Sequence, residues 1–338
     1  MQNTSWKTYD LKGDAKGKPV RVQARVANPF QMKGQWIKAN LHCHLAGIDH
    51  GRPDWTATAP GVYHALGYGT IAGMDHDRLV PVDTDLPVLI VPGAELSPGH
   101  LLALGVDRIP PVDRTAERFQ ATLTHIRQIR EVGGMAVLAH PFNSNWTLDE
   151  IKAMVDAGLE GFEVCNTASW LKGATDRSDQ LWHALHEQGI YLAATGADDA
   201  HGPDDVEDPR MAYRRGWTGI LVDDFTVEAV MAALRAGRSY ASEGPVVEGI
   251  QLSDSGVLEV ATSTVTACHV RSGGGNCGGI TLFPAEHKQV GNRFTLDLAR
   301  MGYRFKESMT IVLEDEHGRY AWISPIRIET TLTDDTVG

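Results

Sequence analysis

A short apolar segment, residues 36–41, ends directly in the sequence His42-Cys-His44. The apolar run predicts a buried strand. Because residues two apart on a strand point to the same side, the two imidazoles would face one spot. Neutral imidazole is a good ligand for Zn, Fe and Mn-type cations. One such pair is weak evidence of a metal site, but later predicted strands end in the same way.

Between residue 36 and about residue 221, short apolar strands alternate with helical segments. Residues 115–132 carry apolar side chains at helical spacing, and Gly133-Gly134 ends that helix. Thr147-Leu-Asp-Glu150 matches a capping box that begins the next helix. This alternation is typical of βα units and predicts the α/β fold class.

The sequence pattern changes after Gly244-Pro245. Short strands between turn residues predict a small all-β, sandwich-like domain over residues 244–330. Residues 1–34 form an N-terminal extension in which residues 20–26 alternate as a possible strand. Residues 35–243 would then be the main domain.

The composition excludes some classes of partner. The formal net charge of −12 argues against binding nucleic acid or an anionic membrane through a general field. The four cysteines show no CxxC spacing, which favours free thiols in a reducing compartment. No leader or membrane-spanning run is evident, so we expect a cytoplasmic protein with a small-molecule substrate; an oligomer is possible.

Polar residues with metal-ligating side chains follow the predicted strands. The carboxyl ends of parallel strands in a βα barrel meet on one face, where catalytic groups collect. His100 instead precedes its strand, so that strand runs opposite to its neighbours or the barrel is irregular. Any one of these histidines could be an ordinary core or surface residue, but the joint pattern is harder to explain that way. The residues at strand ends are His42, His44, His76, Glu95, His140, Asp199 and His201.

Imidazoles mixed with carboxylates are the ligands of two or three catalytic divalent ions, and a carboxylate can bridge two of them. We expect Glu95 to be the bridge and a hydroxide generated between the metals to be the nucleophile. The same ligands serve Mn, Fe and Zn, so the metal is left open.

Seven ordered motifs within residues 36–202 resemble those of the PHP (polymerase and histidinol phosphatase) family of metal-dependent hydrolases. They are His42-Cys-His44, Gly73-Met-Asp-His76, Pro92-Gly-Ala-Glu95, His100-Leu-Leu-Ala-Leu-Gly105, Ala139-His-Pro141, Glu163-Val-Cys-Asn166 and Gly196-Ala-Asp-Asp-Ala-His201. The resemblance implies a distorted (β/α)7 TIM-like barrel with a trinuclear metal site. The segments 237–245 and 318–325 and the β domain look like the CehA/McbA branch of that family.

The resemblance also implies a division of the ligands. His42, His44, Glu95 and Asp199 would hold the first metal, and Glu95, His100 and His140 the second. Asp49 (or its neighbour His50), His76 and His201 would hold the third. The family's usual Thr-Asp-His reads Met74-Asp75-His76 here, and its Ser-Asp-Gly reads Ile48-Asp49-His50, so the second departure falls on the ligands of the third metal.

The function predicted is that of a multinuclear metal-dependent hydrolase, acting on a phosphate ester of a small metabolite, with His201, Asp199 or His76 relaying a proton. Candidate substrate contacts are Asn166, Lys172, Arg177, Arg214 and Arg215. One alternative is the same site acting on a carbamate, ester or amide, with Trp146, Trp170 and Trp182 as aromatic walls. Another is a non-catalytic metal-binding scaffold.

Overall fold

The computed structural model describes residues 5–15, 18–46, 54–202, 215–274, 278–285, 288–298 and 307–333. The chain divides into two compact units. We call Gly34–Trp182 with Leu192–Glu243 the α/β unit, and Met1–Lys33 with His183–Tyr191 and Gly244–Gly338 the β unit. Each is described by itself.

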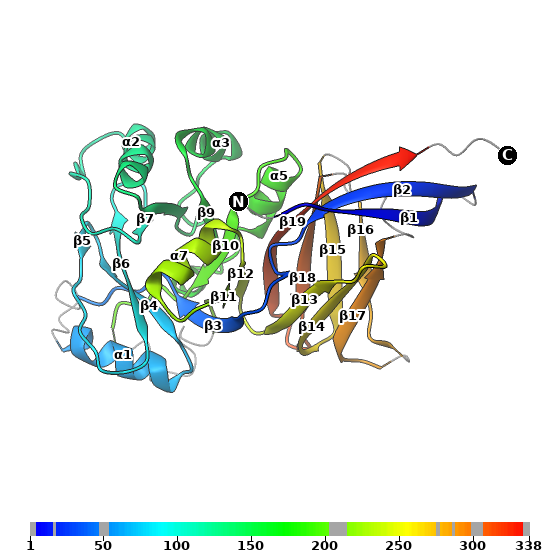
Figure 1. Cartoon of the computed structure of the whole chain (residues 1–338). Helices are drawn as coiled ribbons and strands as arrows, with labels where there is room; N and C mark the ends of the chain where they lie inside the picture. Colours follow the sequence, from blue (N-terminus) through cyan, green and yellow to red (C-terminus); the bar gives the residue numbers. More distant parts are fainter. Residues whose placement is uncertain are drawn as a thin grey trace. The chain divides into compact units, whose positions relative to one another are not determined.

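The α/β unit is organised around one sheet with the strand order β10-β9-β8-β7-β6-β4-β3-β11-β12 (Figure 1). The strands are β3 (Gln35–Asn40), β4 (Thr70–Asp75), β6 (Leu89–Leu96), β7 (Leu101–Leu104), β8 (Met135–Leu138), β9 (Gly161–Asn166), β10 (Ala193–Ala197), β11 (Trp217–Val222) and β12 (Ser239–Ser242). The two-residue strand β5 (Arg78–Leu79) pairs with β4. The unit is mixed α/β, but the predicted alternation of strands and helices is only partial, because β4, β5, β6 and β7 follow one another without a helix.

Parallel and antiparallel ladders are mixed in this sheet. The pairs β3/β4, β4/β6, β8/β9 and β9/β10 are parallel. Strand β7 is antiparallel to both β6 and β8, and β11 is antiparallel to β3 and β12. The prediction that the strand after His100 runs opposite to its neighbours is therefore confirmed.

Strand β6 corrects one prediction. Its sequence predicts an end at Pro92-Gly93, yet the strand continues to Leu96. The reason is a change of partner, because residues up to Pro92 pair with β4 and residues from Gly93 pair with β7. A Cβ on Gly93 would lie 2.9 Å from the backbone oxygen of Ala103, so glycine permits this close pairing. The continuation carries Glu95 into the sheet beside Leu102.

Strand β10, at one end of the order, is linked to β11 by a side chain. Thr218 Oγ1 donates to the backbone oxygen of Gly196 over 2.8 Å and accepts from the backbone N–H of Gly196 over 3.0 Å. An isolated parallel bridge also joins Cys43, which follows β3, to Ala200, which follows β10. The segments after β3 and β10 therefore lie side by side.

Some helices of the α/β unit begin at a residue whose side chain caps the first turn. Thr147 and Glu150 form the predicted capping box of α3 (Leu148–Ala157), and the Glu117 side chain accepts from two backbone N–H groups of α2 (Arg118–Glu131). The others are α1 (Trp55–Ala65), α4 (Thr167–Leu171), α5 (Asp179–His186), which crosses the unit boundary, and α7 (Val227–Arg235).

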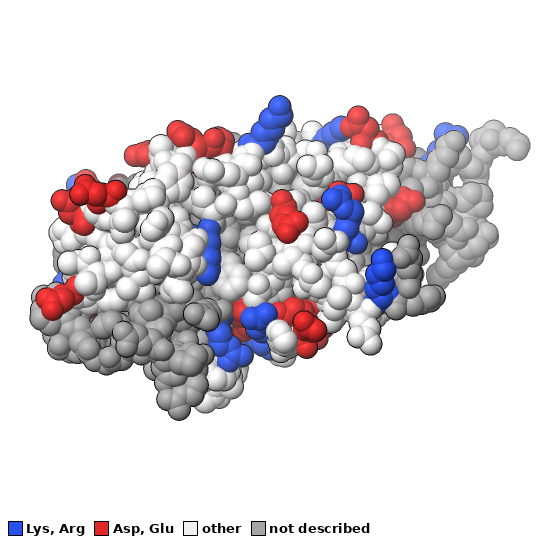
Figure 2. All heavy atoms as spheres, turned by 90° about the horizontal axis from the view of Figure 1, so that it is seen from below, with Lys and Arg blue, Asp and Glu red and all other residues white. Residues whose placement is uncertain are grey.

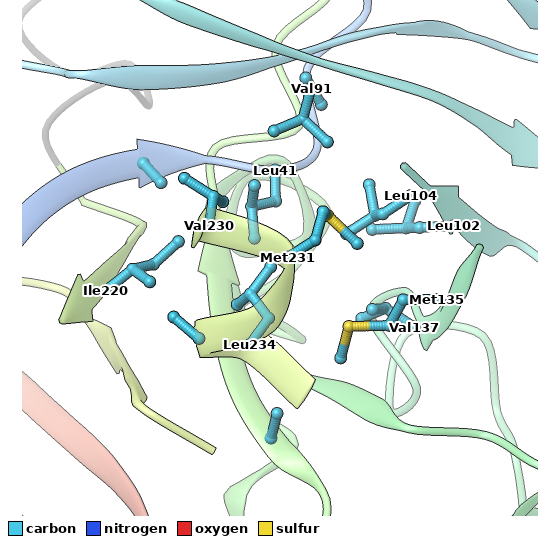
Figure 3. Packing of buried hydrophobic residues seen from close by; sticks show 14 of the residues in the cluster. Leu41, Val91, Leu102, Leu104, Met135, Val137, Ile220, Val230, Met231 and Leu234 are labelled. Carbon is cyan, nitrogen blue, oxygen red and sulfur yellow. The ribbon is translucent and has the colours of Figure 1, made fainter. Parts of the chain in front are cut away.

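Helix α7 packs into the core formed by the strands. Figure 3 shows Val230, Met231 and Leu234 of α7 packed among apolar side chains of the sheet. The other side chains labelled there are Leu41, which follows β3, and the strand residues Val91, Leu102, Leu104, Met135, Val137 and Ile220. Burial of these side chains fixes the strands against one another, which determines where the residues after their carboxyl ends are placed.

The β unit contains two sheets. One has the order β1-β2-β19-β18-β15-β16, and the other is β13-β14-β17. The strands are β1 (Lys7–Ala15), β2 (Lys18–Ala27), β13 (Val247–Leu252), β14 (Val257–Val265), β15 (Ala267–Gly273), β16 (Gly279–Leu282), β17 (Gly291–Asp297), β18 (Ser308–Glu314) and β19 (Tyr320–Thr333). The predicted strand over residues 20–26 lies within β2, which pairs with β1 and β19.

Among the described residues, no helix is both long and apolar enough to cross a membrane.

Candidate metal centre

Backbone bridges bring the predicted ligand residues together. His44 pairs with Met74 at the end of β4, and His76 pairs with Glu95 near the end of β6. The backbone N–H of Asp199 donates to the backbone oxygen of His42 over 3.0 Å. These short contacts between the ends of different strands and the segments that follow them place histidines and carboxylates from distant parts of the sequence around one point.

Four side-chain atoms converge there. Nε2 of His44 lies 3.3 Å from Nε2 of His42 and 3.1 Å from Oδ1 of Asp199. Nε2 of His42 lies 3.2 Å from the same Asp199 oxygen. Oε2 of Glu95 lies 3.5 Å from Nε2 of His42 and 3.3 Å from Nε2 of His44. All four side chains are buried.

This spacing fits a divalent cation. Four ligands placed tetrahedrally at the usual Zn–N and Zn–O bond lengths are separated from one another by about 3.3 Å. Five of the six separations in a set of four ligands are given above, and these five run from 3.1 to 3.5 Å. The donor set of imidazole nitrogens and carboxylate oxygens is also one that Zn, Mn and Fe accept.

A second group shares Glu95. Its Oε1 lies 2.7 Å from Nδ1 of His100 and 3.5 Å from Nε2 of His140. Glu95 therefore directs one oxygen at His42 and His44 and the other at His100 and His140. Within the described part of the chain, the sets of side chains close enough to hold an ion include His44/His76/His201, His42/His44/Glu95, His42/His140/Asp199 and Glu95/His100/His140.

The third group is partly exposed to solvent. The ring of His201 is stacked on that of His44 with centroids 4.0 Å apart, and the ring of His76 lies 4.5 Å from that of His44. The side chains of His76 and His201 are 30% and 28% exposed. Asp49 and His50, the other ligands that the sequence predicts here, lie outside the described residues.

Each of four histidines uses Nδ1 for a protein partner, which fixes the ring and leaves Nε2 for the cluster. Nδ1 of His42 contacts Glu163 (3.1 Å) and Nδ1 of His44 contacts Asp75 (3.2 Å). Nδ1 of His140 contacts the Ser144 hydroxyl (2.9 Å), and Nδ1 of His201 contacts the backbone oxygen of Asp199 (2.9 Å).

The electrostatics of the cluster favour bound positive charge. Burial alone would lower the pKa of His42, but Asp199, Glu163 and Glu95 raise it well above its usual value. Burial would raise the pKa of Glu95, but His42 and the neighbouring imidazoles lower it well below its usual value. The carboxylates thus favour positive charge at the imidazoles, and a divalent cation would satisfy the same field.

Three of the candidate ligand residues have strained backbones. The φ angles of His100, His140 and Asp199 are 53°, 29° and 55°, in the left-handed region that side chains other than glycine rarely adopt. Such conformations cost about 1–3 kcal/mol each and cluster at functional sites, where the surrounding structure enforces them. Their coincidence with the cluster supports a functional constraint on these three positions.

The predicted substrate contacts separate into different environments. Asn166 and Arg215 line a small open pocket, with no enclosed space for a water-sized molecule, together with Trp170, whose ring centroid lies 4.1 Å from the Arg215 guanidinium carbon. Arg177 instead forms a bidentate ion pair with the buried Glu243, over 2.9 and 2.7 Å. Lys172 is exposed at the end of α4, and Arg214 lies outside the described residues.

Two of the three tryptophans proposed as walls of an apolar pocket are core residues. Trp146 is 3% exposed and Trp182 is 2% exposed. Trp182 donates from Nε1 to the backbone oxygen of Leu192, and Trp146 packs under the guanidinium of Arg118. Only Trp170 lines the pocket beside Asn166.

The structure adds polar residues that sequence reasoning left without a role. Asp75 accepts from His44 and from the backbone N–H of His76, and Glu163 accepts from His42. Asp198 is fully buried and accepts from Asn40 and Tyr63; burial raises its pKa to about 7. The position of Asp75 and Asp198 directly before a candidate ligand was the available signal.

The surface seen in Figure 2 carries basic and acidic side chains interspersed. On that face, the described residues form no broad field of one sign. Its charge pattern does not favour a particular class of charged macromolecule.

A scan of the chain against protein-family models finds no match, and a search of curated proteins also finds none. Among solved structures, the chain is similar to a two-domain protein from Bacteroides vulgatus ATCC 8482 that contains a predicted PHP-like metal-dependent phosphoesterase. The two chains are 13% identical with a TM-score of 0.49, and the similarity covers 90% of this chain and 98% of the other. At this level of similarity, the function of the chain is inferred from its own residues.

Proposed function

We propose that this chain is a multinuclear metal-dependent hydrolase that cleaves phosphate esters of small molecules. The observation that carries the proposal is the convergence of His42 Nε2, His44 Nε2, Glu95 Oε2 and Asp199 Oδ1 at separations of 3.1–3.5 Å. Two imidazoles directed at the same two carboxylates are arranged for a cation.

The ligand atoms divide between ions in only a few ways. His42 and His44 each have one ring nitrogen left after Nδ1 contacts its carboxylate, so each serves one ion. We assign both to a first ion with Glu95 and Asp199. Glu95 Oε1, His100 and His140 then hold a second ion, with Glu95 as the bridge. His76 and His201 are left for a third, which would need a further ligand such as Asp49.

Divalent ions bound there would polarise a phosphoryl oxygen and lower the pKa of a water molecule toward neutrality. The protein residues supply the rest. Glu95 and Asp199 hold the positive charge in a buried site where electrostatic interactions are strong. The partly exposed edge formed by His76 and His201 is where a substrate can approach the ligand atoms.

We assign the proton transfer to Nε2 of His201. Its Nδ1–H donates to the backbone oxygen of Asp199, which fixes the tautomer and leaves Nε2 to carry the proton that a leaving alkoxide needs. His76 and Asp199 are the other two residues that the sequence suggests for this step. A third ion bound to Nε2 of His201 would exclude it from this role.

Phosphate is favoured over carbonyl chemistry by the motifs and by Arg215. Most enzymes of the family that the seven motifs resemble cleave phosphate esters, and Arg215 lies beside Asn166 in the pocket. Trp170 in the same pocket favours the alternative, a carbamate, ester or amide hydrolase, because it offers an apolar wall. Membership of the PHP family and a distorted (β/α)7 barrel are part of the proposal and are supported by those motifs. The CehA/McbA branch is also part of it and is supported by the segments 237–245 and 318–325 and the β domain.

The test is a paired hydrolysis assay on protein reconstituted separately with Mn, Fe or Zn. One arm uses nitrophenyl phosphate mono- and diesters, and the other uses nitrophenyl carboxylate esters and carbamates. His140→Ala removes a candidate ligand, and His64→Ala, on the exposed face of α1, is the matched control.

Turnover of phosphates only, lost in His140→Ala and kept in His64→Ala, is the expected result. Turnover confined to the carbonyl arm would contradict the substrate class while preserving the metal site. Turnover that is unchanged in His140→Ala would contradict the site itself.

A further inference from the structure

Glu163 lies behind the metal cluster, in the middle of the buried strand β9, and is 1% exposed. Its two carboxylate oxygens have different partners. Oε1 accepts from Nδ1–H of His42 over 3.1 Å. Oε2 accepts from the backbone N–H of His140 over 2.8 Å and from Nδ2 of Asn166 over 2.9 Å.

The contact with Asn166 extends to a third ligand residue. Nδ2 of Asn166 also lies 3.3 Å from Oδ2 of Asp199, and its Oδ1 accepts from the backbone N–H of Ser169 at the start of α4. The orientation of the amide is therefore fixed from both ends. One carboxylate thus contacts His42 and His140 directly and Asp199 through a single amide.

We propose that Glu163 is the positioning residue that sets the relative placement of His42, His140 and Asp199, and so determines the metal affinity of the centre. This inference rests on the proposed metal site. His42, His140 and Asp199 come from segments that follow three different strands, so their placement needs a common anchor. Glu163 provides it because its oxygens contact the His42 side chain, the His140 backbone and the Asn166 amide at the same time.

The partners of Glu163 explain why this position needs a carboxylate. The imidazole N–H, the backbone N–H and the amide N–H2 are all donors, and an ionised carboxylate is the side chain that only accepts. In Glu163→Gln the amide has one acceptor oxygen and one N–H2. Whichever way it is turned, the N–H2 faces a donor, either His42 on one side or His140 and Asn166 on the other. That conflict displaces at least one ligand residue.

The expected loss of metal affinity follows from other metal sites. Loss of a residue that hydrogen-bonds a metal ligand there typically weakens metal affinity by about 10–100-fold. A shift of the His140 backbone would displace a ligand of the second ion. A rotation of the His42 ring would displace a ligand of the first. We therefore expect Glu163→Gln to weaken binding at both assigned sites.

The experiment measures metal affinity of the full chain directly. Metal-free wild type and Glu163→Gln are titrated with Zn²⁺ in competition with a chromophoric chelator. Visible spectra of the Co²⁺-loaded proteins report the coordination of the ion. Glu131→Gln, which removes an exposed carboxylate at the end of α2, is the matched control.

We expect Glu163→Gln to bind Zn²⁺ about 10–100-fold more weakly and to change the Co²⁺ spectrum, while Glu131→Gln does neither. A merely structural role would lower the thermal stability of the metal-free chain and leave affinity and spectrum unchanged. That result would overturn the proposal.

A second variant covers the case in which Glu163→Gln does not fold. Asn166→Ser keeps a good N-cap for α4 but is too short to join Glu163 to Asp199. We expect it to weaken Zn²⁺ binding less than Glu163→Gln, and unchanged affinity would contradict the proposed link to Asp199. Wild-type protein that binds no Zn²⁺ would overturn both this inference and the proposed function, whereas wild-type binding with unaltered affinity in Glu163→Gln would overturn the inference alone.

Discussion

Nε2 of His42 and Nε2 of His44 lie 3.3 Å apart in a buried site. Both rings direct Nδ1 at a carboxylate, Glu163 for one and Asp75 for the other. If each Nδ1 keeps its proton, the two Nε2 lone pairs face each other, and only a proton or a cation between them relieves the repulsion. The packing of the strands therefore creates a position that favours a bound cation, which the proposed hydrolysis requires.

The loss of kcat on removal of the His201 imidazole should depend on the leaving group of the substrate. His201→Asn removes the imidazole that we assign to protonation of the leaving alkoxide. We expect kcat for an alkyl phosphate to fall by about 10²-fold or more, because an alkoxide leaves poorly without a proton. Nitrophenyl phosphate, whose leaving group is stable as an anion, should be much less affected.

The measurement is kcat for both substrates in wild type and variant at equal metal content. An equal loss on the two substrates would contradict a proton-transfer role and would instead fit a ligand role for His201.

A substitution at Arg177 distinguishes a structural role of this residue from a role in substrate binding. The sequence predicts a substrate contact, but the guanidinium pairs bidentately with Glu243, whose side chain is 6% exposed. Arg177→Met removes the bidentate partner of that buried carboxylate. We expect the free energy of unfolding to fall by about 2 kcal/mol, at the low end for such pairs because the guanidinium is partly exposed.

Denaturant unfolding and steady-state kinetics of Arg177→Met check this, with Arg177→Met/Glu243→Gln expected to recover part of the lost stability. A raised KM with unchanged stability would favour the substrate contact that the sequence suggests.

His186 of α5 should make stability depend on pH. Its side chain is buried, and burial, with the nearby His183, lowers its pKa to about 3. The unfolded chain binds this proton more tightly, so its contribution to stability is fully present above about pH 6.5 and is lost as the pH falls toward 3. The limiting slope is about 1 kcal/mol per pH unit.

Thermal unfolding between about pH 7 and about pH 5 in wild type and His186→Leu measures this contribution. The melting temperature of the wild type should fall more steeply with acidification than that of the variant. Parallel curves would contradict the pKa shift.

The strand-end positions of the ligand residues could be predicted because local sequence encodes them. Apolar runs followed by His or a carboxylate predicted the strands β3, β4 and β8, and polar groups after such strands gather at one edge. The start of α3 was predicted for the same reason, since Thr147 and Glu150 satisfy its first N–H groups locally.

Contacts between distant residues could not be predicted in this way. His42 and Glu163 are 121 positions apart, and no local pattern links them. Arg177 was interpreted as a substrate contact from its position in a loop. Its partner, Glu243, lies 66 positions away, and no local pattern links the two residues. The end of β6 was placed too early because proline and glycine usually interrupt a strand, whereas here Pro92 marks a change of partner strand.

The number of divalent ions bound per folded chain tests the central claim most directly. Metal-free protein would be reconstituted with Zn²⁺, Mn²⁺ or Fe²⁺, desalted and analysed for metal by mass spectrometry, with Glu95→Gln and the control Glu131→Gln in parallel. We expect about two ions per chain in wild type and in Glu131→Gln, with a clear loss in Glu95→Gln because both ions share that carboxylate. Wild-type protein that retains no ion with any of the three metals, or Glu95→Gln that retains as many as wild type, would contradict the proposed metal centre.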